Sequence, residues 1–515
     1  MDFLSPVITG FGVVFQPENL LYCLLGVTLG MLVGVLPGLG PAATIAILLP
    51  ITYNIEPTSA IIMLAGIFYG AQYGGTITSV LLRLPGEASS VVTAIDGHEM
   101  AKQGRAGAAL GIAAIGSFIG ATIAIVAMTF LAPAVSGFAV DFGPAEYTML
   151  ALLGILLVTT LGTGSPSRGM LMALLGLLLA TVGQDPLQGT ARLTFGSDDL
   201  LDGIDFVIVA MGVFGVGEIL YNLESLRRKT PPPAAVGSVY PTRKDIRESS
   251  SAIGRGSVTG FLLGILPGGG ATMSSMVAYA VEKRTSKHRE RFGRGAIQGV
   301  AGPETANNAA ATSSFIPLLS LGIPANATMA VMFGALMLQG ITPGPLLVDD
   351  EPELFWGVVN SMYVGNLLLL AMSLPLIGMF VRILRVRPAI LAPLTILITM
   401  IGVYSVRMNV FDMFLMIGLG VLGYLMKKVG FEPGPLVLAF VLGGILESAF
   451  RRSMRTFDGQ LSGFLTQPIA ATLFGAIALI VVLALLRAVR NRRALRNRRA
   501  TERRTEPAEP AGPRR

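Results

Sequence analysis

The chain has 515 residues, of which 52% are hydrophobic and only 13% are charged, and its mean hydropathy is +0.68. A soluble domain carries roughly 25% charged residues, so this composition excludes a soluble globular protein and indicates a membrane protein. Cys23 is the single cysteine, which excludes an intrachain disulfide, and the net charge of +7 is concentrated in an Arg-rich C-terminal tail.

Apolar runs recur along the chain from Leu20 to that tail. About ten to twelve of them have the roughly 20-residue length that a membrane-spanning helix needs. Met1 to Asn19 lack the pattern of a cleaved signal peptide, so we expect the first span to be retained. The sequence therefore predicts an all-α polytopic membrane protein, divided into a first membrane repeat (1–224), a polar cytoplasmic linker (225–251), a second membrane repeat (252–486) and a disordered cytoplasmic tail (487–515).

Two apolar segments are broken by the same Pro-Gly pattern, "LVGVLPGLGP" at 32–41 and "LGILPGGGA" at 263–271. A second break follows in each half, "LLRLPGEASS" from Leu81 and "LSLGIPANAT" from Leu319, and a weaker echo, "VGQDP" and "VGFEP", starts at Val182 and Val429. The common order indicates a duplicated unit.

The distribution of basic residues predicts how the two copies lie in the membrane. No Lys or Arg precedes Arg83, whereas Lys and Arg flank the second Pro-Gly segment on both sides. By the positive-inside rule these flanks are cytoplasmic, so the second segment is expected to be a re-entrant hairpin and the two repeats to be inverted. Arg451, Arg452 and Arg455 conflict with simple alternation of the spans.

Non-helical backbone survives at membrane depth only where protein or a water-filled cavity covers it. Two half-helices that meet at a Pro-Gly break present free N–H groups and positive dipole ends, which suit a carboxylate. A single break could be an ordinary kink, but two copies favour a binding region at the repeat interface. The substrate-binding candidates are Pro37, Gly38, Gly40, Pro267, Gly268 and Gly270, together with the amides Asn307 and Asn308.

Polar residues near the second breaks suit a small hard cation, although such residues also hydrogen-bond between helices without binding anything. Intramembrane carboxylates are costly and therefore suggest function, unless they lie at a helix end near water. The ion-coupling candidates are Thr76, Ser79, Glu87, Glu304, Thr312, Ser313, Glu218 and Glu447. The coupling ion is expected to be Na⁺ or H⁺, with no other cofactor.

Several other functions are disfavoured by the motifs. His98 and His288 lie in polar loops and make no transition-metal constellation. Phosphate-binding loops of the G-x-x-x-x-G-K-[ST] type and the protease motifs H-E-x-x-H and G-x-S-x-G are absent, so we expect no enzyme activity. The basic tail follows a membrane span, which favours cytoplasmic retention beside anionic lipid over binding of nucleic acid.

Four long motifs carry a family resemblance: "GVLPGLGPAATIAILLP", "YGGTITSVLLRLPGEASSVVTAIDGHEMAKQGRAG", "GILPGGGATMSSMVAYAVEKRTSKH" and "GRGAIQGVAGPETANNAAATSSFIPLLSLGIPANATMAVMFGALMLQGITPGP". Together they closely resemble the large membrane subunit of tripartite tricarboxylate transporters, the TctA family, up to about Leu486. The resemblance implies the translocating subunit of a bacterial inner-membrane uptake system that is driven by an ion gradient. It also implies two partners, a small membrane subunit and a periplasmic solute-binding protein, and tricarboxylates or related organic anions as substrates.

Two rival functions remain at this point. The first is a stand-alone ion-coupled anion carrier that needs no partner subunits. The second, a membrane enzyme or sensor, would require a catalytic constellation or a soluble effector domain, and the sequence shows neither.

Overall fold

The computed structural model describes residues 4–36, 40–161, 165–185, 187–225, 236–383, 388–484 and 486. Helices account for most of this part of the chain, and the two short strands form one antiparallel hairpin. The elements of the first half are α1 (Leu4–Val14), α2 (Pro17–Val35), α3 (Pro41–Thr52), α4 (Pro57–Leu82), η1 (Ala88–Ser90), α5 (Thr93–Lys102), α6 (Ala106–Ala139), α7 (Pro144–Leu161), α8 (Pro166–Ala180), β1 (Gly183–Gln184), β2 (Ala191–Arg192), η2 (Asp198–Leu200), α9 (Phe206–Ala210), the π-helix η3 (Met211–Val216) and α10 (Gly217–Ser225).

The second half begins with α11 (Arg243–Ile265) and contains a short 3-10 helix, η4. Its elements are α11, α12 (Gly270–Thr285), η4 (Arg289–Arg291), α13 (Gln298–Ser313), α14 (Phe315–Leu321), α15 (Ala327–Leu338), α16 (Leu347–Asp350), α17 (Pro352–Ser373), α18 (Ile377–Ile383), α19 (Pro388–Arg407), α20 (Val410–Lys428), α21 (Gly434–Thr456) and α22 (Gly463–Thr466), and an apolar helix follows over Pro468–Ala484.

The all-α membrane fold predicted from the sequence is confirmed. Among the described residues, seven helices are long and apolar enough to cross a membrane. Other apolar segments form helices of 10–17 residues. The full-length helices are therefore fewer than the ten to twelve predicted spans, because segments such as α3 and α15 are too short to cross the ~30 Å hydrocarbon core alone.

Proline and capping residues set where many of these helices begin. Pro17, Pro41 and Pro57 occupy the first turns of α2, α3 and α4, where the missing N–H has no intrahelical partner to lose. At α11, the Thr242 side chain and Asp245 form a reciprocal capping box. This cap starts α11 within the predicted 225–251 linker, so the end of that linker is helical.

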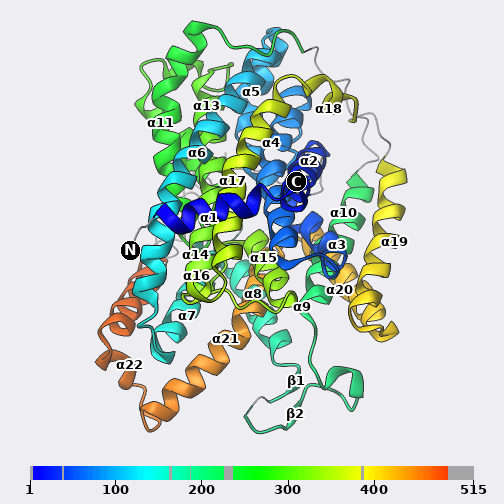
Figure 1. The fold of residues 1–515 in the computed structure, drawn as a ribbon, viewed down its shortest axis with the longest axis vertical. Helices are drawn as coiled ribbons and strands as arrows, with labels where there is room; N and C mark the ends of the chain where they lie inside the picture. The colour runs from blue at the N-terminus through cyan, green and yellow to red at the C-terminus, as the bar shows by residue number, and fades with distance from the viewer. Residues whose placement is uncertain are drawn as a thin grey trace, which may run out of the picture.

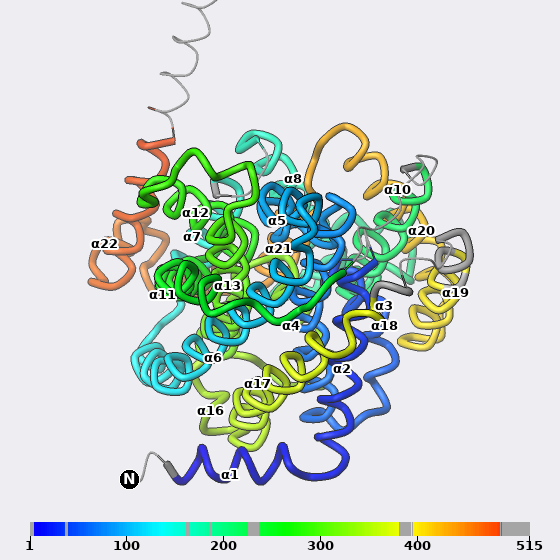
Figure 2. Tube along the Cα trace, turned by 90° about the horizontal axis from the view of Figure 1, so that it is seen from above, coloured from blue at the N-terminus to red at the C-terminus, as the bar shows by residue number. Residues whose placement is uncertain are grey.

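Two long helices with polar residues form the centre of the molecule. Every residue in the most apolar stretch of α4 is buried, and α13 is buried along its length. Viewed from above, α4 and α13 lie near the middle, with α1, α19 and α22 at the periphery (Figure 2). The polar side chains of α4 and α13 are therefore shielded from lipid.

The two halves share one mode of helix packing, which supports the predicted duplication. An ideal Cβ at Gly26, Gly30 or Gly34 of α2 would lie within 2.4 Å of a backbone carbonyl oxygen of α4. In the second half, the residues at the matching positions of α11 make the same approach to α13; they are Gly256, Gly260 and Gly264. Such glycine rows let two helix backbones pack directly against each other.

The second Pro-Gly segment forms the hairpin that the sequence predicts. Arg255 of α11 and Glu282 of α12 form an ion pair of 2.7 Å, although they lie on opposite sides of the Pro-Gly turn. The two helices therefore run antiparallel. Figure 1 shows α11 and α5 at one end of the molecule and the β1–β2 hairpin at the other. The inverted relationship of the two repeats stays a prediction, and the tail (487–515) lies outside the described residues.

The arginine that conflicted with the predicted topology is neutralised by carboxylates. Arg451 makes ion pairs of 2.8 Å with both Asp185, beside the β1–β2 hairpin, and Glu447. Arg192 bonds the same Glu447 at 2.7 Å. The hydrogen bond from the Arg451 guanidinium lowers the pKa of Asp185 below its usual range. Because its charge is paired with carboxylates, Arg451 is weaker evidence for a cytoplasmic location than an unpaired arginine would be.

Candidate functional site

The broken segments of both halves line one central cavity of about 530 Å³. The first half contributes the start of α3 and the second break, Pro85 to Ala88. The second half contributes the turn from Gly268 to Met273 and the start of α15. Breaks that lie far apart in the sequence thus form one wall, as the duplicated pattern predicts.

Four helices point their N-terminal ends at this cavity. Its lining includes the first residues or N-caps of α3, α12, α15 and α21: Gly40, Pro41, Gly270, Ala271, Asn326, Ala327, Pro433 and Gly434. The first N–H groups of a helix have no intrahelical partner, and the helix dipole places partial positive charge there. The cavity is therefore suited to an anion.

Positive backbone angles at two glycines shape the second Pro-Gly turn. Gly268 has φ +82° and Gly270 has φ +52°, in the left-handed region that glycine enters at low cost. The N–H of Gly268 donates a 2.7 Å hydrogen bond to the carbonyl of Ala325, which belongs to the second break of the same half. This bond holds the tips of the two breaks together at the cavity wall.

Four charged side chains line the cavity. Three are carboxylates, Glu87, Glu218 and Glu432, and Lys427 is the one basic residue among the described lining residues. Lys427 forms an ion pair with Glu218 and lies over the ring of Tyr221. Both side chains of this pair are mostly buried, so water would only partly solvate either charge if its partner were removed.

A buried hydrogen-bond network leads from the cavity wall into the protein. Gln72 donates to Glu87 at 3.1 Å and accepts from Ser89 at 2.8 Å. Asn307 donates to Ser89 at 3.3 Å and to Glu304 at 3.2 Å. The network therefore joins the η1 turn and α4 of the first half to α13 of the second.

Glu304 is the buried end of this network. Its carboxylate also accepts hydrogen bonds from Thr76, at 2.6 Å, and from Thr93. It is fully buried, and within the described parts of the chain its side chain has no basic partner. A charged carboxylate in such a place needs a proton or a cation for compensation.

The predicted site residues fall into four groups. Gly40, Gly268, Gly270, Glu87 and Glu218 line the cavity. Asn307, Asn308, Thr76 and Glu304 belong to the buried network behind it. Pro267, Ser79, Thr312, Ser313 and Glu447 lie on neither, and Pro37 and Gly38 lie outside the described residues.

The side chains that lie apart from the cavity have local partners. Ser79 donates to Ser90 at 2.8 Å, and Ser313 donates to the Ala310 carbonyl of its own helix. Glu447 pairs with Arg192 and Arg451 near the β1–β2 hairpin. No residue role among these predictions has been tested, and all of them stay predictions.

Sequence reasoning missed several residues of the site. Lys427 and Asn326 line the cavity, and Thr93 and Ser117 join the network around Glu304. Glu432 and Pro433 also line the cavity. The weak echo "VGFEP" from Val429 was the one sequence signal for this segment. Nothing in the local sequence marked Lys427, which lies at the end of an ordinary apolar helix.

Comparison with known proteins identifies the family of the chain. Residues 20–438 match the model of the tripartite tricarboxylate transporter TctA family. The chain belongs to the TctA family. It is 48% identical over 484 residues, 94% of this chain and 96% of the relative, to an uncharacterized 52.8 kDa protein in the TAR-I ttuC′ 3′ region of Agrobacterium vitis.

A second relative matches over a shorter part of this TctA chain. An uncharacterized protein in the TAR-II ttuC′ 3′ region of Agrobacterium vitis is 52% identical over 225 residues, 44% of this chain and 93% of the relative. No solved structure matches the chain. Family membership and the apolar helices together make this a multi-pass membrane protein of a transporter family.

Proposed function

We propose that this TctA protein is the translocating subunit of a tripartite, binding-protein-dependent transporter that imports tricarboxylates or related organic anions and is driven by an ion gradient. The observation that carries the proposal is the convergence of four helix N-termini, from both halves, on one cavity. Its volume of about 530 Å³ lies in the range of small-molecule sites.

The cavity offers two kinds of partner to a carboxylate. Free N–H groups at the starts of α12 and α15 can bind its oxygens directly, with the helix dipoles adding positive potential. Lys427 supplies a full positive charge, which Glu218 balances when no substrate is bound. A substrate carboxylate that displaces Glu218 from Lys427 would exchange one charge-assisted bond for another.

Charge balance supports coupling to a cation. Three carboxylates and one lysine line the cavity, and Glu304 adds a buried carboxylate behind it. A substrate with two or three negative charges would be repelled unless protons or metal cations enter with it. Helix dipoles alone contribute only about half a charge each.

The partners follow from the family rather than from the cavity. A tripartite system implies a small membrane subunit and a periplasmic solute-binding protein. In this arrangement the protein lies in the bacterial inner membrane with its C-terminal tail in the cytoplasm. The binding protein delivers the anion to an outward state, and one repeat then moves against the rest to expose the site inward.

Reconstitution tests the proposal. Uptake of labelled citrate and other di- and tricarboxylates is measured in proteoliposomes that contain the chain alone or with the small subunit and binding protein from its gene neighbourhood, under an imposed Na⁺ or H⁺ gradient. Uptake that requires all three components and a gradient is expected. Uptake by this chain alone would identify a stand-alone carrier, and gradient-driven uptake of no carboxylate would overturn the proposal.

A further inference from the structure

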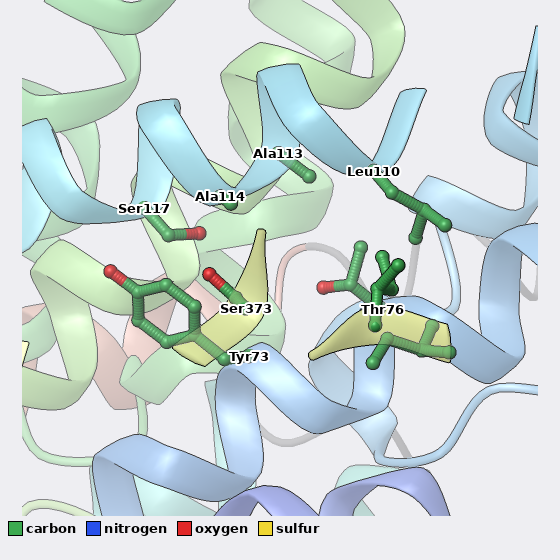
Figure 3. Close-up of a pocket in the computed structure, with 9 residues that line it drawn as sticks. Tyr73, Thr76, Leu110, Ala113, Ala114, Ser117 and Ser373 are labelled. Carbon is green, nitrogen blue, oxygen red and sulfur yellow. The ribbon is translucent and has the colours of Figure 1, made fainter. Parts of the chain in front are cut away.

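A second, much smaller cavity lies beside α4, which also contributes Phe68 and Gln72 to the lining of the larger cavity. Its volume is about 10 Å³, close to that of one water molecule or small ion. Apolar side chains of α4, α6 and α18 form part of its lining, and four hydroxyl groups form the rest: Tyr73 and Thr76 of α4, Ser117 of α6 and Ser373 of α17. Figure 3 shows the Ser117 and Ser373 hydroxyls directed into the same space, with Tyr73 and Thr76 beside them.

Each of these hydroxyls already donates its hydrogen elsewhere. Tyr73 donates to the amide oxygen of Asn366 at 2.8 Å, and Thr76 donates to Glu304 at 2.6 Å. Ser117 donates to the Glu304 carbonyl at 3.2 Å, and Ser373 donates to its own helix at 3.3 Å. The space between them is therefore faced by oxygen lone pairs, which favour a cation.

Glu304 supplies the negative charge beside this cavity. Two of the lining hydroxyls, Thr76 and Ser117, bond its side chain and its backbone. The neighbouring Asn308 bonds Ser117 at 2.8 Å through its amide nitrogen, while its buried side-chain oxygen has no hydrogen-bond partner. The Asn308 amide nitrogen therefore fixes the Ser117 oxygen, which lines the cavity.

The other ionisable groups around Glu304 do not neutralise it. Tyr73 faces it from α4, and Glu87 lies beyond Gln72 on the η1 turn. Asp96 of α5 accepts hydrogen bonds from the Tyr279 hydroxyl and from the backbone N–H groups of Gly293, Gly295 and Ala296. The Arg255–Glu282 pair between α11 and α12 is internally balanced.

We propose that Glu304 and the four hydroxyls form a binding site for the coupling Na⁺ ion. This inference rests on the proposed function, because it names the cation of the same transport cycle. Neutral oxygens with one carboxylate suit a monovalent ion, and the described residues hold no group of three acidic, His or Cys side chains for a divalent one.

The hydrogen-bond network explains how the two sites communicate. Glu304 bonds Asn307, Asn307 bonds Ser89, and Ser89 bonds Gln72 and Glu87 at the cavity wall. Na⁺ at Glu304 fixes this network and thereby the η1 turn that lines the substrate site. The coupling is reciprocal, so Na⁺ raises carboxylate affinity and carboxylate raises Na⁺ affinity by the same factor.

Thermal unfolding of the purified chain in detergent tests the site directly. The Tm is measured against NaCl, with KCl and choline chloride at equal ionic strength as controls. We expect a saturable rise in Tm with Na⁺ alone, a loss of that rise in Glu304→Gln, and at least a fivefold higher half-saturating Na⁺ concentration in the mild variant Ser373→Ala. Ser361→Ala, a buried serine of the same helix α17 that bonds its own helix carbonyl, is the matched control.

Three outcomes would overturn the site, and each differs from failure of the proposed function. A Tm that ignores Na⁺ in the wild type, or Na⁺ stabilisation that persists unchanged in Glu304→Gln, contradicts it. Carboxylate uptake that follows the H⁺ gradient and ignores Na⁺ would leave the transport function standing while removing this inference. Na⁺ stabilisation that Glu304→Gln abolishes, without any carboxylate uptake, would support the cation site and contradict the proposed transport function.

Discussion

The backbone N–H of Gly268 and the carbonyl of Ala325 form a 2.7 Å hydrogen bond that joins two interrupted membrane segments of the second half. In the first half the corresponding contact is steric: an ideal Cβ at Gly86 would lie 2.1 Å from the Gly34 carbonyl oxygen. In both halves the second break is held against the end of the first broken helix. One residue of each contact, Gly86 and Gly268, lines the cavity of about 530 Å³.

Substitution at the Gly268 turn is expected to abolish transport. Gly268→Val places a β-branched residue at φ +82°, where its Cβ would lie 2.6 Å from the Leu157 carbonyl oxygen. Carboxylate uptake in proteoliposomes should fall to background while the protein still inserts. Gly254→Val on α11, where a Cβ meets no atom within 4 Å, is the matched control and should retain uptake. Normal uptake by Gly268→Val would remove this turn from the mechanism.

The two members of the cavity ion pair should have opposite effects on substrate affinity. Lys427→Gln removes a charge-assisted bond to the substrate, so the half-saturating carboxylate concentration should rise about tenfold or more. Glu218→Gln frees Lys427 from its competitor and should lower that concentration. Concentration-dependent uptake checks both. Lys428→Gln, which removes an exposed neighbour paired with Glu224, should change neither. Equal losses in Lys427→Gln and Glu218→Gln would indicate a merely structural pair.

The shared glycine packing predicts equivalent damage in the two halves. An ideal Cβ lies 2.4 Å from the Ile67 oxygen at Gly30 and 2.2 Å from the Ala306 oxygen at Gly260. Gly30→Val and Gly260→Val should each destabilise the fold by roughly 1–3 kcal/mol, because helix backbones cannot yield as side chains do. The Tm in detergent measures this. Gly418→Val on α20, with open space around its Cβ, should unfold as the wild type does.

The Asp185–Arg451 pair predicts a pH-dependent stability of the hairpin region. The pKa of Asp185 is lowered in the folded protein, first by the Arg451 hydrogen bond, so its contribution is complete above the unfolded pKa near 3.8 and is lost as pH falls through the folded pKa. Asp185→Asn should therefore lower Tm at pH 7 and converge on the wild type in strong acid. Asp350→Asn, an exposed carboxylate of α16, is the control; a constant difference at every pH would contradict the ion pair as its source.

Part of the site was predictable because its signal is local. Pro-Gly pairs break a helix wherever they occur, so Gly40, Gly268 and Gly270 could be placed at a cavity from their neighbours alone. Asn307 and Asn308 were predicted to bind substrate, and the structure places both in the buried network. The environment of a residue on a helix depends on which neighbouring helices pack against that side of it. Glu447 shares its intramembrane context with Glu218, yet it pairs with Arg192 and Arg451 instead of lining the cavity.

Composition by itself determined that this is a membrane protein, and the repeated motifs predicted a duplicated unit with a Pro-Gly break in each copy, because hydrophobic length and backbone freedom are properties of short segments. Only the tertiary structure decided which charges meet. Lys427 of α20 reaches Glu218 of α10, and Glu304 of α13 reaches Thr76 of α4 and Thr93 of α5, across separations of hundreds of residues. Such pairings depend on the packing of helices that no local pattern encodes.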